Sequence, residues 1–266
     1  MEVKIYGIDG KEKGKIKLPK VFQTKVREDI IRRAVLAIQS WRRQAYGADK
    51  LAGKRTSAHY HGRRGERWTM MGRGMSRLPR IHGDVGHLVW RARFAPQAVK
   101  GRKAHPPKPE KNWKQKINNK ELLLALKSAL AATVDLTLVK KRGHRYDGEV
   151  PIVLDDDFEN LSKSKDVVEL LKKIGLEKEL ERAKQKKIRS GKGKRRGRKY
   201  IKKKGPIIIV SKDCNVIKAA RNIAGVDIIT VDELKKDMNV ELLAPGTHPG
   251  RLLIITKSAL NAFENG

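Results

Sequence analysis

The feature that most limits how this chain can fold is a long stretch, residues 45–118, in which no helical or strand periodicity persists. It contains 18 Lys/Arg against 4 acidic residues, five of the seven histidines and three of the four tryptophans. A structureless segment of this length is unusual inside a compact domain unless it is functional or folds on a partner. We interpret it as a basic, extended insertion in a single globular domain formed by residues 1–44 and 119–266.

Periodic sequence borders the insertion on both sides. Residues 24–46 carry apolar side chains at three- and four-residue steps, which predicts an amphipathic helix, and a second helix is predicted from Asn119 through residue 133. The first fifteen residues alternate like a strand and have no apolar core of a secretory signal. No apolar run approaches the ~18 residues of a spanning helix, so we expect no membrane association.

After residue 150, short apolar segments alternate with helical ones. Strands are predicted at 150–154, 206–210, 226–231 and 251–256, and helices at 165–175, 176–187, 214–225 and 232–237. Continuously apolar strands separated by helices are typical of a mostly parallel sheet covered on both faces. The sequence therefore predicts an α/β fold, a three-layer α/β/α sandwich, with Gly175 ending one helix. A second basic loop is expected at 189–204, where ten of sixteen residues are Lys or Arg.

The charge of the chain indicates its class of partner. Lysine and arginine number 62 against 29 acidic residues, for a formal net charge of +33. Such a chain repels itself unless a polyanion neutralises it, and nucleic acid is the leading candidate. The one cysteine, Cys214, excludes an internal disulfide and favours a reducing compartment such as the cytosol.

Side-chain types in the insertion favour RNA over duplex DNA. Arginine predominates, and its planar guanidinium suits phosphates and stacks on bases. Tyr60, Trp68, Trp90, Trp113 and the histidines supply faces for unstacked bases, and no groove-reading motif is present. The residues predicted to bind RNA are Arg42, Arg43, Lys54, Arg55, Arg63, Arg64, Arg67, Trp68, Arg73, Arg77, Arg80, Arg91, Arg93, Arg102, Lys103, Lys192, Lys194, Arg195, Arg196, Arg198 and Lys199.

Nucleotide and metal sites find little support. The segment "GRGMSR" (72–77) lacks the third glycine of a dinucleotide fingerprint, and Gly53-Lys54 is followed by Arg55 where a P-loop needs Ser or Thr. His59 and His61 have the spacing to chelate a metal, but no second pair of ligands has convincing spacing. We therefore expect no cofactor and no metal, and interpret Cys214 as a packing residue rather than a nucleophile.

One alternative to RNA binding alone rests on three consecutive carboxylates. Asp155, Asp156 and Asp157 follow a predicted strand, where α/β enzymes often place catalytic or magnesium-binding groups. They fit a solvated turn equally well, and no base, nucleophile or phosphate-binding loop accompanies them. An RNA-acting enzyme that uses Asp155–Asp157 is therefore the alternative hypothesis to a binding protein without catalytic activity.

Several blocks spread over nearly the whole length of the chain have a familiar sequence and order. These blocks are "YGADKLAGKRTSA" (46–58), "GRGMSRLPR" (72–80), "PQAVKGRKAHPPKPEK" (96–111), "ALKSALAAT" (125–133), "SGKGKRRGRKY" (190–200), "AARNIAGVDI" (219–228) and "LAPGTHPGRLLIITKSAL" (243–260). Through these blocks the chain resembles the L-four family of large-subunit ribosomal proteins in its archaeal form.

The resemblance implies a structural component of the cytoplasmic ribosome that acts as a single copy and supports subunit assembly. It implies that the globular domain lies on the outside of the large subunit while the insertion threads into ribosomal RNA. The tip would form one side of the peptide exit tunnel constriction, opposite the L-twenty-two protein. The expected tip residues, with exposed methionines, are Met70, Met71, Gly72, Arg73, Gly74 and Met75.

Overall fold

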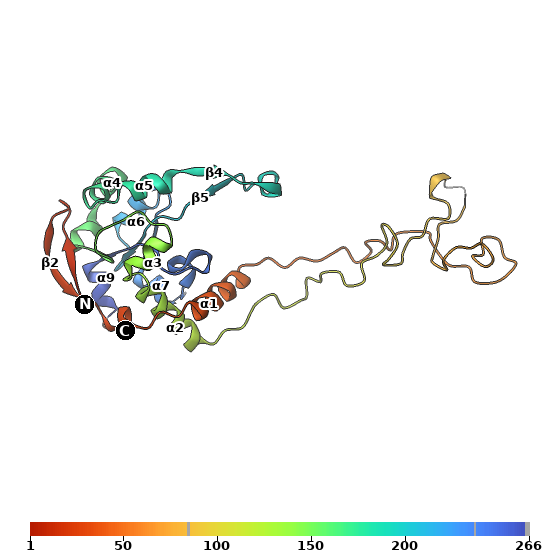
Figure 1. The fold of residues 1–266 in the computed structure, drawn as a ribbon, viewed down its shortest axis with the longest axis horizontal. Coiled ribbons are helices and arrows are strands. Elements are labelled where there is room, and N and C mark those ends of the chain that lie inside the picture. The colour runs from red at the N-terminus through yellow and green to blue at the C-terminus, as the bar shows by residue number, and fades with distance from the viewer. Residues whose placement is uncertain (84–85, 237, 264–266) are drawn as a thin grey trace. The chain divides into compact units, whose positions relative to one another are not determined.

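In a computed structural model, which describes residues 1–83, 86–236 and 238–263, the chain divides into two compact units. The first, here called the body, comprises Met1–Arg42 together with Lys114–Gly266. The second, here called the insertion, comprises Arg43–Trp113 (Figure 1). The insertion leaves the body after helix α1 (Glu28–Trp41) and returns before helix α2 (Asn119–Ala131).

A six-stranded sheet forms the middle of the body, in the order β2-β1-β3-β8-β6-β7. The strands are β1 (Glu2–Tyr6), β2 (Glu12–Lys17), β3 (Ile152–Leu154), β6 (Ile207–Val210), β7 (Asp227–Thr230) and β8 (Leu253–Thr256). Edge strand β2 pairs antiparallel with β1, and the other neighbours pair in parallel. The predicted mostly parallel sheet is confirmed.

Helices cover both faces of the sheet, so the body has three layers (Figure 1). One face packs against α1, α2, α7 (Val231–Lys236), α8 (Val240–Leu243) and α9 (Lys257–Ala262). The other packs against α3 (Leu136–Lys141), α4 (Ser164–Lys173), α5 (Glu177–Lys184) and α6 (Asn215–Ala220). The α/β/α sandwich expected from the sequence is thereby confirmed.

The strand β6 shows why its sequence is apolar without interruption. Ile207 and Ile209 are buried in the core on one side of the sheet, and Ile208 and Val210 in the core on the other. Successive side chains of a strand point to opposite faces, and both faces are covered here. The four-residue apolar run is therefore the expected sequence of a doubly buried strand.

Some helices are shorter in the structure than their predicted ranges. Helix α1 begins at Glu28 rather than Thr24, with Glu28 and Asp29 placing negative charge at its N-terminus. Gly175 ends α4 as predicted, with a φ of +93° that favours glycine. The predicted helix 176–187 is wrong at its end, because α5 stops at Lys184 and residues 186–188 form strand β4.

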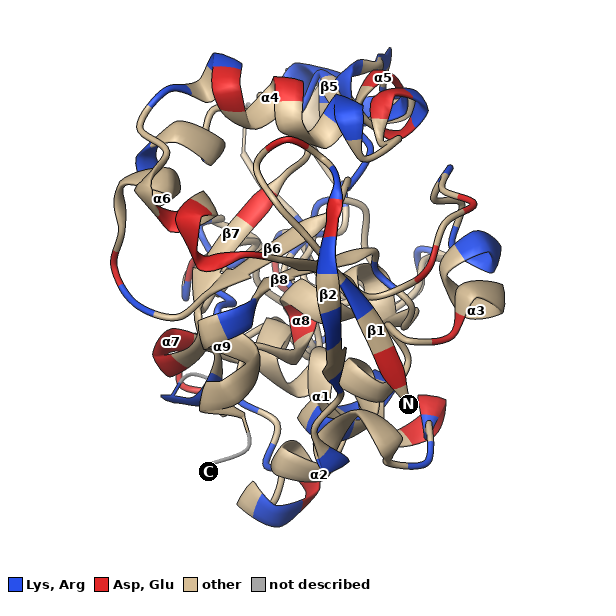
Figure 2. Cartoon of the chain, turned by 90° about the vertical axis from the view of Figure 1, so that its left-hand side faces the viewer, with Lys and Arg blue, Asp and Glu red and all other residues tan. Residues whose placement is uncertain are grey.

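Acidic and basic residues alternate over the surface of the body. Figure 2 shows both signs of charge lying close together around α4 and α5. Lys172 and Glu177, for example, form an ion pair of 3.3 Å between these helices. Residues 45–118 hold 18 Lys/Arg and 4 acidic residues, so most cations of the insertion have no acidic residue to pair with inside it.

Candidate nucleic-acid interface

The insertion is built from two limbs that run antiparallel, held by local backbone contacts rather than by a sheet (Figure 1). The Ala48 N–H donates to the carbonyl of Pro107 at 3.0 Å. At Gly53 the φ angle is +74°, and an added Cβ would lie 2.5 Å from backbone atoms of Gly101 and Arg102. Glycine alone combines this φ with so close an approach, so Gly53 fixes where the two limbs meet.

Arg80 organises the part of the insertion beyond the limbs. Its backbone N–H donates to the His59 carbonyl at 3.1 Å, and its guanidinium donates to the Trp90 carbonyl and the Ser76 hydroxyl, both at 2.8 Å. The guanidinium of Arg93 likewise donates to the Val99 carbonyl at 3.0 Å. Both arginines were predicted to bind RNA, and the structure gives each an internal role in holding the insertion together.

The insertion has almost no apolar core of its own. Among its described residues, Met70 at 2% exposure and Ile81 at 7% are the buried apolar side chains. Its backbone is instead ordered by turns and by single bridges, such as those from Arg80 to His59 and to Ala92. A segment of this kind gains little from burying apolar surface, and a partner must supply most of the energy that orders it.

The predicted tip carries one correction. Met70, one of the tip methionines expected to be exposed, is buried at 2% exposure, and its backbone N–H donates to the His61 carbonyl. Gly72, Arg73 and Gly74 are exposed, and both glycines have positive φ, +75° and +64°. The remaining tip methionines, Met71 and Met75, are half-buried. The exposed surface of the tip is therefore glycine and arginine more than methionine.

The tryptophans of the insertion contact side chains of the insertion itself. The ring centroids of Trp68 and Trp90 lie 5.3 Å apart, and the Arg73 guanidinium lies 4.6 Å from the centroid of Trp90. Trp113 packs against Tyr46, with a centroid separation of 4.6 Å. The half-buried rings of Trp68, Trp90 and Trp113 thus contact neighbours within the insertion, and their stacking on bases stays a prediction.

Most of the other predicted contacts on and beside the insertion lie on the surface. Arg42, Arg43, Lys54, Arg55, Arg63, Arg64, Arg67, Arg73, Arg77, Arg91 and Lys103 are exposed, whereas Trp68, Arg80, Arg93 and Arg102 are half-buried. Three of the exposed arginines have acidic partners close by. Arg42 pairs with Glu241 at 2.7 Å within the body. Within the insertion, Arg55 pairs with Asp49 at 2.5 Å and Arg63 with Glu66 at 3.8 Å. Surface pairs of this kind contribute little and exchange readily for phosphate.

The second basic segment is a hairpin, where the sequence indicated only an irregular loop. Strands β4 (Lys186–Ile188) and β5 (Tyr200–Lys202) pair antiparallel, and the connecting turn contains a short 3-10 helix at Gly191–Arg196. We call residues 186–202 the basic hairpin (Figure 1). Its predicted RNA contacts are all exposed, namely Lys192, Lys194, Arg195, Arg196, Arg198 and Lys199.

The carboxylates behind the enzyme alternative have structural roles. Asp155 accepts a hydrogen bond from Lys13 Nζ at 2.5 Å, and this bond lowers the pKa of the carboxyl. Asp156 accepts from the N–H and hydroxyl of Ser258, at 2.7 and 2.6 Å, at the start of α9. The hydrogen bonds of these carboxylates fit a turn that ties β3 to its neighbours.

Cys214 is half-buried. Burial raises the pKa of its thiol and keeps the thiol protonated.

A cationic cavity of about 620 Å³ in the body was not anticipated from the sequence. Burial lowers the pKa of one lining residue, Arg142, to about 10, and the charges of Arg251 and Arg182 add to the effect. The other cations that line it are Lys141, Arg182, Lys203 and Lys204, and Glu28 is the one acidic residue among its described lining residues. These residues come from separate parts of the chain, so no local motif signals the cavity, which can accept an anionic group.

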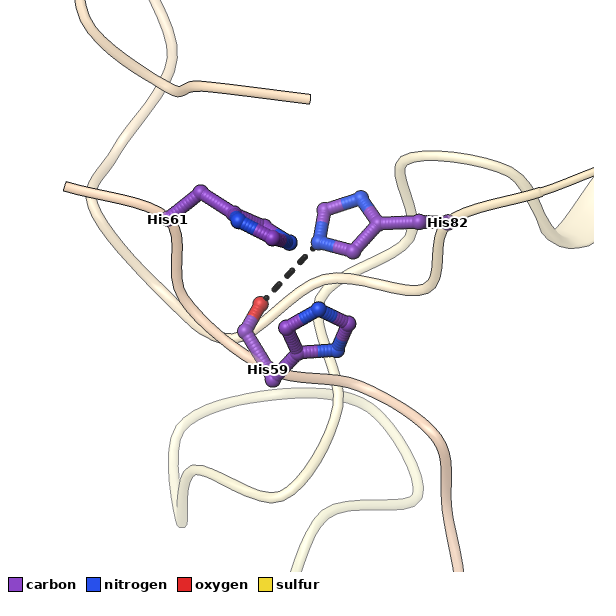
Figure 3. Close-up of side chains that lie close together, drawn as sticks. All are labelled: His59, His61 and His82. Carbon is purple, nitrogen blue, oxygen red and sulfur yellow. Dashed lines mark hydrogen bonds between the residues drawn. The ribbon is translucent and has the colours of Figure 1, made fainter. Parts of the chain in front are cut away.

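Three histidines of the insertion lie together beside the tip. Figure 3 shows the rings of His59, His61 and His82 facing a common space. Each offers a ring nitrogen within 4.8 Å of the others. The sequence indicated the first two, and the antiparallel bridge between His59 and Arg80 brings in the third. His82 is thus a candidate residue that spacing along the sequence did not reveal.

Among the described residues, no helix is long and apolar enough to cross a membrane. Comparison with known proteins shows which family the chain is similar to over nearly its whole length. Residues 16–266 match the model of the ribosomal protein L4/L1 family. The chain is 54% identical over 270 residues to the large ribosomal subunit protein uL4 of Nanoarchaeum equitans, covering 99% of this chain and 98% of the relative.

Two further relatives carry the same description. The chain is 48% identical to the large ribosomal subunit protein uL4 of Archaeoglobus fulgidus, over 98% of this chain and 97% of the relative. It is 46% identical to that of Haloarcula marismortui, over 98% of both chains. The match therefore includes the body, the insertion and the basic hairpin.

Proposed function

The chain belongs to the ribosomal protein L4/L1 family, whose members are structural proteins rather than enzymes, and from this premise we propose a role for each basic segment. The chain is a constituent of the large ribosomal subunit, where it associates with ribosomal RNA and ribosomal proteins. In our proposal the insertion enters the RNA, and residues 70–75 form part of the wall of the peptide exit tunnel. The L-twenty-two protein faces them at the constriction, and the chain acts as a single copy that supports subunit assembly.

The observation that carries the proposal is the contrast between the charge of the insertion and the size of its core. Residues 45–118 hold 18 Lys/Arg and 4 acidic residues, while Met70 and Ile81 are the buried apolar side chains among the described residues 43–113. Phosphates would neutralise the arginines and release counterions, which is the main source of affinity for nucleic acid. RNA folded around the insertion would also supply the contacts that its own core lacks.

The basic hairpin and the cationic cavity extend the proposed interface to the body. The hairpin presents cations on exposed strands and on the intervening turn, with Lys186 and Lys199 close to the ring of Tyr200. Exposed Lys and Arg at such spacing position a protein on an RNA backbone without reading its sequence. We assign these two features to phosphate contacts that hold the body against the subunit surface.

Photocrosslinking tests the tunnel assignment directly. A photoreactive amino acid replaces Met71 at the tip in one variant and Lys192 on the basic hairpin in a matched control, each in the full chain assembled into ribosomes. Radiolabelled nascent peptides are then stalled and irradiated. We expect crosslinks to the nascent peptide from position 71 and crosslinks to RNA alone from position 192.

The same experiment separates the tunnel assignment from the ribosomal role. Both variants should sediment with the large subunit, since family membership does not depend on where the tip lies. Further variants carry the photoreactive amino acid at each of positions 70 and 72–75. If these variants and the one at position 71 all crosslink only to RNA, the tip does not line the tunnel. Such a result would leave the structural role in the subunit intact and remove residues 70–75 from the tunnel wall.

A further inference from the structure

The histidine cluster has the composition of a metal site, and we propose that His59, His61 and His82 together bind a divalent transition-metal ion of the zinc class. The proposal is independent of the tunnel assignment, since it concerns the insertion itself. Imidazole is the commonest nitrogen ligand of Zn²⁺, and three protein ligands with one open position form a recurrent zinc arrangement. The sequence supplies two of these histidines, and the fold brings the third beside them.

The three rings already share one small volume. Their centroids are separated by 4.3 Å for His59 and His61, 4.6 Å for His59 and His82, and 4.7 Å for His61 and His82 (Figure 3). Ligand nitrogens on the three residues all lie within 4.8 Å of one another. Tetrahedral Zn²⁺ with bonds of about 2.0–2.1 Å needs nitrogens roughly 3.3 Å apart. Metal binding would therefore bring the three nitrogens closer together than they lie here.

One ring nitrogen that faces the common space, Nε2 of His61, is buried without a hydrogen-bond partner. A buried polar atom with no partner is costly, so its presence calls for an explanation such as an ion that occupies the site. The nitrogen of His82 that faces the same space, Nε2, lies 3.2 Å from the His59 carbonyl oxygen, a hydrogen bond that an ion would replace (Figure 3).

Other groups hold two of the rings in an orientation suited to ligation. His59 Nδ1 lies 2.8 Å from the carbonyl oxygen of Ser57, which leaves Nε2 of that ring for a metal. The Glu66 carboxylate lies 3.8 Å from His61 Nδ1, on the side of the ring opposite its unpartnered nitrogen. A carbonyl or carboxylate behind a ligating histidine is the usual way in which a metal site fixes the ring.

A bound ion would add a side-chain link between two segments that a backbone bridge already joins. His59 and His61 belong to one limb of the insertion and His82 to the returning chain, and the backbone bridge between His59 and Arg80 lies beside them. With Met70 and Ile81 as the buried apolar side chains of this described region, one ion with three protein bonds would be a major stabilising contact. The open fourth position would take a water molecule, or a phosphate oxygen when RNA is present.

The test is zinc binding to the full-length chain. The protein is stripped with a chelator, and Zn²⁺ is titrated against a chromogenic competitor at about 0.15 M salt, which screens the positive charge of the chain. We expect one ion per chain. Removal of a group that only orients a ligand lowers metal affinity by up to about 100-fold. His82→Gln removes a ligand itself, so it should lower the affinity for Zn²⁺ by at least about 100-fold.

His105→Gln is the matched control, because His105 is an exposed histidine of the same insertion outside the cluster. Its affinity should equal that of the wild type. X-ray absorption of the zinc-loaded wild type needs no variant, and it should report three imidazole nitrogens at about 2.0 Å. Fewer than three imidazoles, equal affinity in His82→Gln and wild type, or no binding at micromolar zinc would each overturn the proposal.

Discussion

Glu179 accepts a hydrogen bond from Arg182 at 2.6 Å, and both side chains are buried in the body. His144 Nδ1 lies 2.7 Å from the same carboxylate, and the Arg145 N–H donates to it at 3.0 Å. Burial alone would raise the pKa of Glu179, but the bonds from Arg182, His144 and Arg145 outweigh it and lower the pKa to about 2. This carboxylate links α5 to the segment after α3 at the rim of the cationic cavity.

Acid should destabilise the body through this network. The folded-state pKa of Glu179 is depressed, so its contribution is complete above the unfolded value of 4.5 and is lost as the pH falls toward 2. A shift of this size corresponds to roughly 3 kcal/mol in the free energy of unfolding. Burial also lowers the pKa of His144. Below its ordinary value of 6.5 the unfolded chain therefore binds a proton more readily than the folded chain, and the folded state loses stability.

Urea unfolding followed by circular dichroism at a series of pH values measures this dependence. Glu179→Gln should flatten the curve between about pH 4.5 and about pH 2, because the substituted side chain does not titrate. Glu177→Gln, at the exposed start of the same helix, is the control and should keep the wild-type slope. An undiminished acid dependence in Glu179→Gln would mean that other carboxylates cause it.

Gly53→Ala should loosen the insertion and leave the body unchanged. The new Cβ would lie 2.5 Å from backbone atoms of the opposite limb, and the φ of +74° is unfavourable for alanine. Limited proteolysis of the free protein should cut the insertion several-fold faster than in the wild type. Gly65→Ala has a φ of +83° but open space around it, so it reports the backbone strain alone. Equal cleavage rates in the two variants would show that the limb contact is unimportant.

Arg77→Ala should weaken RNA binding in a salt-dependent way. If Arg77 contacts one phosphate, its removal reduces the slope of log affinity against log salt by about 0.7 to 0.9. The measurement is filter binding of the full chain to a large-subunit RNA fragment at several salt concentrations. Lys165→Ala is the control, because this lysine is 84% exposed and lies on α4, outside the proposed interface. A slope that does not change in Arg77→Ala would exclude a phosphate contact.

Asp156→Ala should cost stability without any effect on RNA affinity. The variant loses the hydrogen bonds from Ser258 at the start of α9, an effect of about 1 kcal/mol for a capping interaction. Thermal unfolding and the same filter-binding assay provide the two readouts. Asp157→Ala, whose 60% exposed side chain makes a 3.4 Å contact with Lys13, should change the stability less. Loss of RNA affinity in Asp156→Ala would give these carboxylates a function beyond the turn.

The body could be predicted well because its signals are local and repeat. Strand β6 has a continuous apolar sequence because both of its faces are covered. Gly175 ends α4 because few other residues adopt its φ. Strand β4 was missed for the opposite reason. Lys186 and Lys187 fit the end of a helix as well as a strand, and only their pairing with β5 decides between the two.

The interior of the insertion could not be predicted because long-range contacts determine it. Met70 is apolar in a segment without periodicity, so nothing in its neighbourhood indicates whether it is buried. His82 joins His59 and His61 through a bridge at Arg80, more than twenty residues along the chain. The residue types of this region indicate its chemistry, but its partners become visible only in three dimensions.

The two ends of the insertion are fastened beside each other. In the body, the Gln115 N–H donates to the hydroxyl of Ser40 at 2.9 Å, and Trp41 Nε1 donates to the Gln115 carbonyl at 2.9 Å. Because both ends are held, the insertion can enter RNA only as two limbs side by side, never as a single strand. In the placement proposed above, the opening in the RNA must therefore be wide enough for both limbs.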